Sequence, residues 1–355
     1  MTGILKPLPT HNPLASTLGH NLLMNLQTSF AQLSAGLREQ IIGQDGLIDG
    51  LLIGLLAEGH VLLEGPPGVA KTRAVRCLAG MIDADFQRIQ FTPDLLPADL
   101  TGSEIFRPQD GSFTFQPGPV FHNIVLADEI NRAPAKVQSA LLEAMGERQV
   151  TIGAITYPMP ALFMVLATQN PIEHEGTYPL PEAQLDRFLM KLTVDYPAAA
   201  AERDILALAR AEARQLTGGS VSPVPRGFPS VTSTFRVAQE QVFAARREVL
   251  DLHLAPVLEG YIVDLVAATR QPERIDPARA GQVRYGASPR GAIALERAAR
   301  AHAWLAGRDY VSPADIQAML LPVLGHRVLL SYEAEARGES VRELLQAIIR
   351  NTPVP

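Results

Sequence analysis

The chain has 355 residues, a formal net charge of −6 and a hydrophobic content of 47%. A chain of this length can form two domains and a sizeable core without help from disulfides or metals. The single cysteine, Cys77, excludes a disulfide framework, and the eight histidines show no zinc-type spacing. This composition is typical of the reducing cytoplasm, where Cys77 is expected to act as a small apolar core residue.

No segment approaches the ~18 consecutive apolar residues that a membrane span needs, and the first residues lack the apolar run of a signal peptide. We therefore expect neither export nor membrane insertion. The chain also has no short run rich in Lys and Arg, so nucleic acid is not expected as a partner.

In chain order, residues 1 to about 18 are rich in Pro, Thr and Asn and are expected to form an irregular arm. A helix is predicted next, from apolar residues that recur at helical spacing: Leu22, Leu23, Leu26, Phe30, Leu33 and Leu37. The arm and the start of this helix make up the first predicted region, residues 1–34.

The second predicted region, residues 35–195, alternates helical segments with short apolar strands. Helices are expected over 46–59 and from Lys71 onward, and strands over 61–65, 88–91, 123–128, 162–168 and 189–194. Short apolar strands separated by helices are typical of an α/β fold with a parallel sheet covered on both faces.

The third predicted region, residues 196–355, is expected to be a linker followed by a small all-α domain. Residues 216–233 are rich in Gly, Pro and Ser and predict the linker or a long loop. Helices are predicted near 236–252, 255–269, 291–307, 313–333 and 340–350. Ser312 precedes Pro313 as an N-cap, and Trp304 is expected in the core.

The stretch GPPGVAKT, Gly65 to Thr72, lies between a predicted buried strand and a predicted helix. It follows the pattern G-x-x-x-x-G-K-[ST], whose backbone amides cradle phosphates, except that Ala70 replaces the last Gly. Gly65 and Gly68 are expected to supply the tight turns, Lys71 the charge and Thr72 a hydroxyl for Mg²⁺. Ala70 is tolerable at this position if its φ is negative, because only a left-handed conformation would cost ~1–2 kcal/mol. A chance Gly/Pro turn is the alternative.

The strand in NIVLADEINRAP ends in two adjacent carboxylates, Asp128 and Glu129. Because the carboxyl ends of parallel strands face the ligand crevice, we expect Asp128 to hold a hydrated Mg²⁺ and Glu129 to polarise the attacking water. Asn170, which follows LFMVLAT, is expected to orient that water. From the residues alone, a solvated acidic pair and an ordinary Asn-Pro turn are the alternatives.

The segments GPPGVAKT, LADEINRAP, ATQNP, EGTYPLPEAQLDRF and GASPRG together resemble the MoxR family of AAA+ ATPases, from about residue 35 to near 350. The resemblance implies an AAA+ P-loop NTPase core with a parallel sheet, followed by a small all-α lid. It also implies that the Ala of the phosphate loop is common in the family. Arg187 would be the arginine finger that reaches the ATP of a neighbouring subunit, and Arg290 the sensor-2 arginine of the lid. The segment IIGQ, Ile41 to Gln44, would lie near the adenine.

The expected site residues follow from these motifs. ATP contacts are predicted for Ile41, Ile42, Gly43, Gln44, Gly65, Pro66, Pro67, Gly68, Val69, Ala70, Lys71, Thr72 and Arg73. Metal contacts are predicted for Thr72 and Asp128. Catalytic roles are predicted for Lys71, Asp128, Glu129, Asn170, Arg187 and Arg290. Phosphoryl transfer needs positive charge around the transferred group in the transition state. In GTPases, an arginine supplied in trans raises the rate by a factor of ~10³–10⁵. From the residues alone, Arg187 in an ion pair with Asp186 or Glu182 is the alternative. His174 is expected in a subunit-interface loop.

Two insertions refine the resemblance. TGSEIFRPQDGSFTFQPGP contains a predicted hairpin turn at QDGS and is similar to the helix-2 insertion of MoxR proteins, magnesium-chelatase motors and MCM-type helicases. A second hairpin, over 146–160, precedes the strand that leads to Asn170 and corresponds to a pre-sensor-1 hairpin. Both would face the pore of a ring. The tip TIGAITY is uncharged, which favours a protein client over nucleic acid, although a packed hairpin with no substrate contact is the alternative.

The resemblance implies an ATPase that works as a ring, expected to be a hexamer, and uses Mg·ATP hydrolysis to remodel or mature client proteins. A partner with a von Willebrand factor A domain is also implied. The alternatives are the motor subunit of a metal chelatase, a nucleic-acid motor and a scaffold that binds nucleotide with little turnover. The sequence leaves open the client, the ring size and whether Arg290 acts on its own subunit or on the next.

Overall fold

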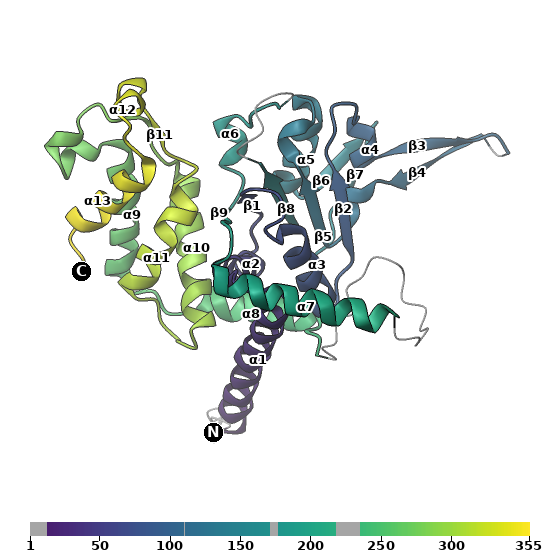
Figure 1. Cartoon of the computed structure of the whole chain (residues 1–355), viewed down its shortest axis with the longest axis horizontal. Helices are drawn as coiled ribbons and strands as arrows, with labels where there is room; N and C mark the ends of the chain where they lie inside the picture. Colours follow the sequence, from purple (N-terminus) through teal and green to yellow (C-terminus); the bar gives the residue numbers. More distant parts are fainter. Residues whose placement is uncertain (1–12, 110, 171–176, 218–234) are drawn as a thin grey trace, which may run out of the picture.

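The computed structural model describes residues 13–109, 111–170, 177–217 and 235–355. A sheet domain, which runs from α2 to β9, lies beside a helical domain, which runs from α9 to α13, and the long helix α1 extends away from both (Figure 1). Within the described ranges, no helix is both long enough and apolar enough to cross a bilayer.

The sheet domain is built on five parallel strands in the order β2-β5-β8-β1-β9. Their bounds are Val61–Glu64 for β1, Phe86–Gln90 for β2, Ile124–Asp128 for β5, Met164–Gln169 for β8 and Met190–Thr193 for β9. All five strands predicted from apolar segments are present, so the expected α/β fold with a parallel sheet is confirmed.

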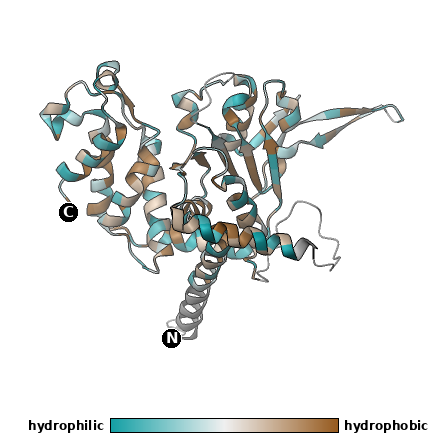
Figure 2. Ribbon diagram, viewed as in Figure 1, coloured by the Kyte–Doolittle hydropathy of each residue, from teal (hydrophilic) through white to brown (hydrophobic). Residues whose placement is uncertain are grey.

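Successive residues of the strands face two separate cores. Val61 and Leu63 belong to a cluster shared with α2 (Asp45–Leu56) and α3 (Lys71–Met81), whereas Leu62 belongs to a second cluster shared with α5 (Ala135–Glu147). The inner strands β1, β5 and β8 are therefore apolar on both faces, and the middle of the sheet is largely brown in Figure 2, whereas the edge strand β2 buries only Ile89. This double burial is why continuous apolar runs predicted them.

Both expected hairpins are present. β3 (Gly102–Arg107) pairs with β4 (Ser112–Pro117) after the short helix α4 (Pro97–Thr101), and β6 (Gln149–Ile152) pairs with β7 (Ile155–Pro158). The β3–β4 hairpin projects far from the sheet domain (Figure 1). The rings of Phe115 and Tyr157 stack with centroids 3.9 Å apart, so the two hairpins contact each other.

Helix α1 spans Pro13–Gln40, so the expectation of an irregular arm to about residue 18 is wrong over residues 13–18. Pro is favoured at the first position of a helix because its fixed φ suits helical geometry. Four of the apolar residues at helical spacing are buried: Leu26, Phe30, Leu33 and Leu37.

The chain after β9 is mainly helical. Its helices are α7 (Ala199–Thr217), α8 (Gln239–Asp251), α9 (Pro256–Arg270), α10 (Pro289–Leu305), α11 (Pro313–Leu324), α12 (Tyr332–Ala336) and α13 (Val341–Asn351), and the short helix α6 (Glu182–Leu185) precedes β9. Helix α7 was not predicted, and it contains residues 216 and 217 of the expected linker. The rest of that linker, residues 218–233, lies outside the described residues.

The prediction of one helix over 313–333 is wrong. Helix α11 ends at Leu324, and the chain turns to form β11 (Leu329–Leu330), which pairs with β10 (Val283–Tyr285). The backbone groups of this segment therefore pair with those of β10 instead of with each other along a helix. At the start of α11, Ser312 is the N-cap as expected, and its N–H donates to the Asp315 carboxylate at 2.9 Å.

Trp304 joins α10 to α1 and α8. Its ring is 2% exposed and meets the ring of Phe30 edge-on at 5.2 Å, and its Nε1 donates to Oε2 of Glu248 at 3.0 Å. The expected core position is confirmed. A large aromatic in this place ties the N-terminal helix to the helices at the C-terminal side of the chain.

We predict that Trp304→Ala lowers the free energy of unfolding by about 3–5 kcal/mol, because it leaves a cavity and an unpaired Glu248 carboxylate. Urea unfolding measures this loss. Val257→Ala, at a position that is 58% exposed, is the control and should change the same free energy by less than about 0.5 kcal/mol. Equal effects of the two changes would contradict this description of the core.

Candidate functional site

The loop from Gly65 to Ala70 joins β1 to the N-terminus of α3. A Cβ on Gly65 would lie 2.1 Å from the carbonyl oxygen of Val194, so the close approach of the two chain segments requires glycine there. Gly68 has a φ of +85°, which glycine adopts without strain. The tight loop turns its backbone toward the start of α3, the arrangement that binds phosphate at helix N-termini.

Ala70 has a φ of 63° and a ψ of 15°, so the negative φ at which alanine would be free of strain is not what this residue adopts. Ala70 is the N-cap of α3, and its carbonyl accepts the N–H of Ala74 at 2.9 Å while its own backbone is left-handed. The chain must reverse sharply at this point to enter the helix, and the loop accepts a cost of ~1–2 kcal/mol that glycine would avoid.

The carboxyl ends of β5 and β8 and this loop surround a cavity of about 360 Å³, which we call the phosphate cavity. Its lining is the loop with the start of α3, the ends of β5 and β8, and the residue after β8: Pro67, Gly68, Val69, Ala70, Lys71, Thr72, Arg73, Asp128, Glu129, Thr168, Gln169 and Asn170. The structure thus brings together Lys71, Thr72, Asp128, Glu129 and Asn170, as the motifs predicted.

Lys71 lies over the loop that precedes it. Its Nζ donates to the carbonyl oxygens of Gly65 at 2.5 Å and Pro66 at 3.2 Å. Burial lowers the pKa of Lys71, whereas the nearby charges of Asp128, Glu129 and Glu64 raise it. A phosphate oxygen that entered the cavity would offer this ammonium a charged acceptor in place of two neutral ones.

Asp128 is held by two residues that the motifs did not predict. Its Oδ1 accepts from Oγ1 of Thr168 at 2.6 Å, and its Oδ2 accepts from Nε and Nη2 of Arg88 at 2.9 and 2.6 Å. The Thr168 hydroxyl also accepts the N–H of Glu129 at 2.8 Å. Thr168 could have been found from its place before Gln169 at a strand end. Arg88 gives no such signal, because its contact depends on the pairing of β2 with β5.

Glu129 has a left-handed backbone, with φ 57° and ψ 49°. Its Oε2 accepts from Nε2 of Gln90 at 2.8 Å and pairs with Nε of Arg132 at 3.0 Å. A non-glycine residue in this conformation costs about 1–3 kcal/mol, and such strain is concentrated at functional sites. The backbone conformation of Glu129 and the contacts of its side chain therefore both fix the position of its carboxylate.

The oxygen groups at the cavity fit a magnesium ion. Mg²⁺ prefers oxygen ligands and binds through one or two carboxylates, several waters and substrate phosphates. Thr72 and Asp128 both line the cavity, and a carboxylate has about four lone-pair sites, so the bonds from Arg88 and Thr168 leave capacity for a hydrated ion.

The segment Ile41 to Gln44 lies outside the lining of the phosphate cavity. Ile41 is buried, and Nε2 of Gln44 donates to the carbonyl oxygen of Asp195 at 2.8 Å. Gly43 and Gln44 line a neighbouring cavity of about 460 Å³ beside the ends of β1 and β9. Arg73 does line the phosphate cavity, and its Nη2 pairs with Oε1 of Glu212 on α7 at 2.5 Å.

Arg187 and Arg290 lie together, away from the phosphate cavity of their own chain. Both line a cavity of about 450 Å³ that shares no lining residue with the phosphate cavity. Nη1 of Arg187 donates to the carbonyl oxygen of Leu142, and its guanidinium lies against Gly146 on the last turns of α5. Arg290 is exposed at the start of α10.

The second cavity, which we call the arginine cavity, carries an excess of positive charge. Its lining includes five arginines and two carboxylates: Arg148, Arg187, Arg290, Arg297, Arg327, Glu58 and Asp186. Asp186 pairs with Arg327 at 2.9 Å and Glu58 pairs with Arg148 and Arg246. Among the residues that the structure describes, Arg187, Arg290 and Arg297 have no carboxylate within ion-pair distance, so the alternative of an Arg187 ion pair is not what this chain forms.

Two smaller predictions concern other residues. Cys77 is buried in α3 as expected, and burial raises the pKa of its thiol, which suits an inert core residue. His174, expected in a subunit-interface loop, lies outside the described residues.

The comparison with known proteins agrees with this geometry. The ATPase family associated with various cellular activities (AAA) matches residues 60–190, and the AAA lid domain matches residues 277–348. The chain is 46% identical to Chaperone MoxR1 of Mycobacterium tuberculosis over 316 residues, which cover 89% of this chain and 79% of that protein. The chain belongs to the MoxR family of AAA+ ATPases.

Other MoxR relatives and a solved structure extend over nearly the whole chain. Protein MoxR of Paracoccus denitrificans is 38% identical over 339 residues, which cover 92% of this chain and 96% of that protein. A crystal structure of a protein from Cytophaga hutchinsonii, classed as an ATPase, matches with a TM-score of 0.85 at 43% identity and covers 96% of this chain and 99% of that one. The expected AAA+ fold with a helical lid is confirmed.

We predict that Ala70→Gly stabilises this MoxR-family ATPase by about 0.5–1 kcal/mol. Glycine removes the left-handed strain of ~1–2 kcal/mol, which is partly offset by the greater freedom of glycine in the unfolded chain. Urea unfolding measures the change. Ala74→Gly, in the interior of the same helix, is the matched control and should destabilise by about 1 kcal/mol. Destabilisation by both changes would contradict the left-handed geometry of Ala70.

A second prediction concerns pH and His60, which lies half-buried in the lining of the arginine cavity. Its Nδ1 accepts the N–H of Val165 at 2.9 Å, and its Nε2 lies 3.3 Å from the carbonyl oxygen of Met145. Burial lowers the pKa of His60 to about 4. The unfolded chain therefore binds a proton that the folded protein excludes between pH 6.5 and about 4, so this contribution to stability is complete above pH 6.5 and is lost as the pH falls through that window.

We expect His60→Asn, which keeps an acceptor for Val165, to reduce the loss of unfolding free energy between pH 7 and pH 5 by about 2 kcal/mol. Urea titrations at the two pH values measure this difference. His253→Asn, at an exposed position, reports the effect of removing a surface histidine. An unchanged pH dependence in His60→Asn would rule out a buried neutral imidazole.

Proposed function

We propose that this MoxR-family protein hydrolyses Mg·ATP at the contacts between subunits of a cytoplasmic ring, with six copies as the expected number, and that it uses the reaction to remodel client proteins. The observation that supports this most directly is the separation of the two cavities. The phosphate cavity holds Lys71, Asp128 and Glu129, whereas Arg187 and Arg290 line a cavity with no residue in common. A second copy of the chain would supply what the first lacks.

The residues of the phosphate cavity can carry most of the chemistry. Backbone amides of the loop and the Lys71 ammonium would bind the phosphates, and Glu129 would accept a proton from the attacking water while Asn170 orients it. Thr72 and Asp128 would hold Mg²⁺, which neutralises charge on the phosphates when bound. Thr168 would keep Asp128 and Glu129 in place through its shared hydroxyl.

The arginine cavity would supply positive charge to the ATP of the neighbouring subunit. Phosphoryl transfer spreads negative charge over the oxygens of the transferred group, and catalysis depends on positioned cations around it. Guanidinium groups suit this task because they stay charged and donate in a planar fork. We infer that both Arg187 and Arg290 act in trans, because the two side chains line one cavity.

The hairpins support a polypeptide client. Ile105, Phe106 and Phe113 on the β3–β4 hairpin and Ile155 on the β6–β7 hairpin are about half exposed or more. Residues 150–158 contain no charged side chain, and a surface that binds nucleic acid needs cations for the phosphates. The chaperone named among the relatives agrees with such a client, and a partner with a von Willebrand factor A domain belongs to the same proposal.

A subunit-mixing experiment tests the trans arrangement. Glu129→Gln leaves a chain that donates arginines but cannot activate water, and Arg187→Ala leaves an intact phosphate cavity without its donor. Each variant alone should hydrolyse ATP at least about 100-fold more slowly than the unaltered chain. A mixture of the two should recover turnover, because Arg187→Ala subunits next to Glu129→Gln subunits would have complete sites.

The total activity of each mixture is compared with the sum of its separate components over a range of ratios. Lys71→Ala, which removes the phosphate-binding charge, replaces Glu129→Gln as a second donor and should also restore activity. Wild-type turnover by Arg187→Ala, or equal turnover per chain by a protein that remains monomeric during the assay, would refute the proposal.

A further inference from the structure

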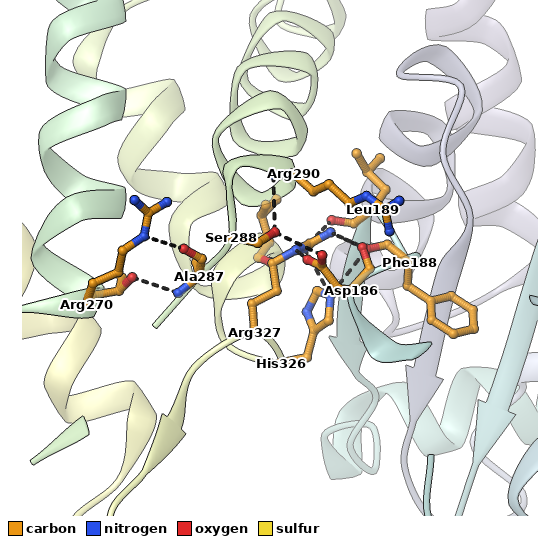
Figure 3. A network of polar contacts seen from close by, with 11 residues as sticks. Asp186, Phe188, Leu189, Arg270, Ala287, Ser288, Arg290, His326 and Arg327 are labelled. Carbon is orange, nitrogen blue, oxygen red and sulfur yellow. Dashed lines mark hydrogen bonds and ion pairs between the residues drawn. The ribbon is translucent and has the colours of Figure 1, made fainter. Parts of the chain in front are cut away.

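Asp186 lies where the sheet domain contacts the helical domain, directly before Arg187 in the chain. Its Oδ1 accepts from Nε of Arg327 at 2.9 Å, and its Oδ2 accepts from Oγ of Ser288 at 2.9 Å (Figure 3). The side chains of Asp186 and Arg327 are only 19% and 3% exposed. One carboxylate of the sheet domain therefore holds two separate segments of the helical domain.

The bond to Ser288 connects Asp186 with Arg290. Ser288 is the N-cap of α10, and its Oγ accepts the backbone N–H of Arg290 at 3.2 Å. The same hydroxyl that donates to Asp186 thus fixes the first turn of the helix on which Arg290 stands. Arg290 is linked to Asp186 through two consecutive hydrogen bonds.

The bond to Arg327 connects the helical domain with the backbone on both sides of Arg187. Nη2 of Arg327 donates to the carbonyl oxygens of Asp186 at 3.2 Å and Phe188 at 2.5 Å, and its Nη1 donates to that of Leu189 at 3.0 Å. A buried guanidinium that satisfies several carbonyls and a carboxylate holds the segment in one conformation, because each lost bond would leave a buried group unpaired.

Charge gives these contacts a second effect. Burial lowers the pKa of Arg327, the charge of Asp186 raises it, and the charge of Arg290 lowers it again, so Arg290 is near enough for repulsion to matter. Asp186 offsets this repulsion between like charges. Without the negative charge of Asp186, the start of α10 and the segment that contains Arg187 would lose a hydrogen bond that joins them. They would also lose the anion that lies between them.

We propose that Asp186 is a positioning residue that locks Arg187 and Arg290 into one unit, so that both arginines reach the neighbour's ATP together. This inference rests on the proposed trans reaction and adds a residue that touches neither phosphate nor water. Ser288 and Arg327 are the two residues of the helical domain that bind Asp186 and complete this unit. The sheet domain and helical domain then present their arginines as one rigid surface.

The test uses Asp186→Asn in the full chain, which keeps the size of the side chain and removes its charge. Its kcat for ATP should fall about 10- to 100-fold, the effect expected when a group is displaced by about 1 Å from its productive place. The KM for ATP should stay unchanged, because the phosphate cavity contains none of these residues. Mixing with Glu129→Gln subunits should restore turnover, as for Arg187→Ala, since the phosphate cavity of Asp186→Asn is intact.

Ser288 provides a milder pair of variants. Ser288→Ala removes the hydroxyl that links Asp186 to α10 and should lower kcat several-fold, whereas Ser288→Thr keeps a hydroxyl and should retain kcat. Ser340→Ala is the matched control, because Ser340 caps α13 through the same kind of bond to Glu343 N–H at 3.2 Å. Both Ala variants lose an N-cap worth about 1 kcal/mol, but only Ser288→Ala should lose activity.

The outcomes separate this inference from the proposed function. If Arg187→Ala is inactive and recovers on mixing while Asp186→Asn and Ser288→Ala keep the wild-type kcat, the positioning role is refuted and the trans reaction stands. The role is also refuted if Asp186→Asn fails to recover on mixing and Ser288→Ala behaves like Ser340→Ala, which would indicate a general loss of folding. If Arg187→Ala itself is fully active, the trans reaction fails first.

Discussion

The alignment of three strand ends governs the chemistry that this chain can perform. Glu64 and Gln169 are paired in the register of β1 and β8, and β5, which pairs with β8 on its other side, ends at Asp128. The residues that follow these ends, the phosphate loop, Glu129 and Asn170, are therefore brought to one cavity although they are far apart in sequence. Burial of the sheet on both faces fixes this alignment, since a shift of one residue would turn apolar side chains to the wrong core.

Much of this arrangement could be predicted, because it depends on local patterns. Apolar runs located the five strands, and the motifs located Lys71, Thr72, Asp128 and Glu129. The remaining features depend on pairing between distant segments. Arg88 reaches Asp128 only because β2 lies next to β5, and the left-handed backbone of Ala70 results from the geometry of a loop between strand and helix. Helix α7 was missed although Pro197 lies two residues before its start and Ala, Leu, Glu and Arg, which favour helices, make up most of it.

The predicted arginines illustrate a different limit. Their identification came from resemblance, and a single chain can show only where they lie. They line one cavity, apart from the phosphate cavity, and Asp186 ties the segment of Arg187 to the helix of Arg290. Spacing in the sequence gives no sign of this connection, since Asp186, Ser288 and Arg327 are each separated by dozens of residues.

Helix α5 adds a mechanical link between the two cavities. It begins shortly after Glu129 and the 3₁₀ turn Ile130–Arg132, and its last turns carry Leu142 and Gly146, against which the guanidinium of Arg187 rests. Its 13 residues form a stiff rod about 20 Å long. A displacement beside Glu129 would be transmitted along this rod to its far end, where Arg187 contacts Leu142 and Gly146. In the ring proposed above, such a relay would let each completed reaction influence the next one.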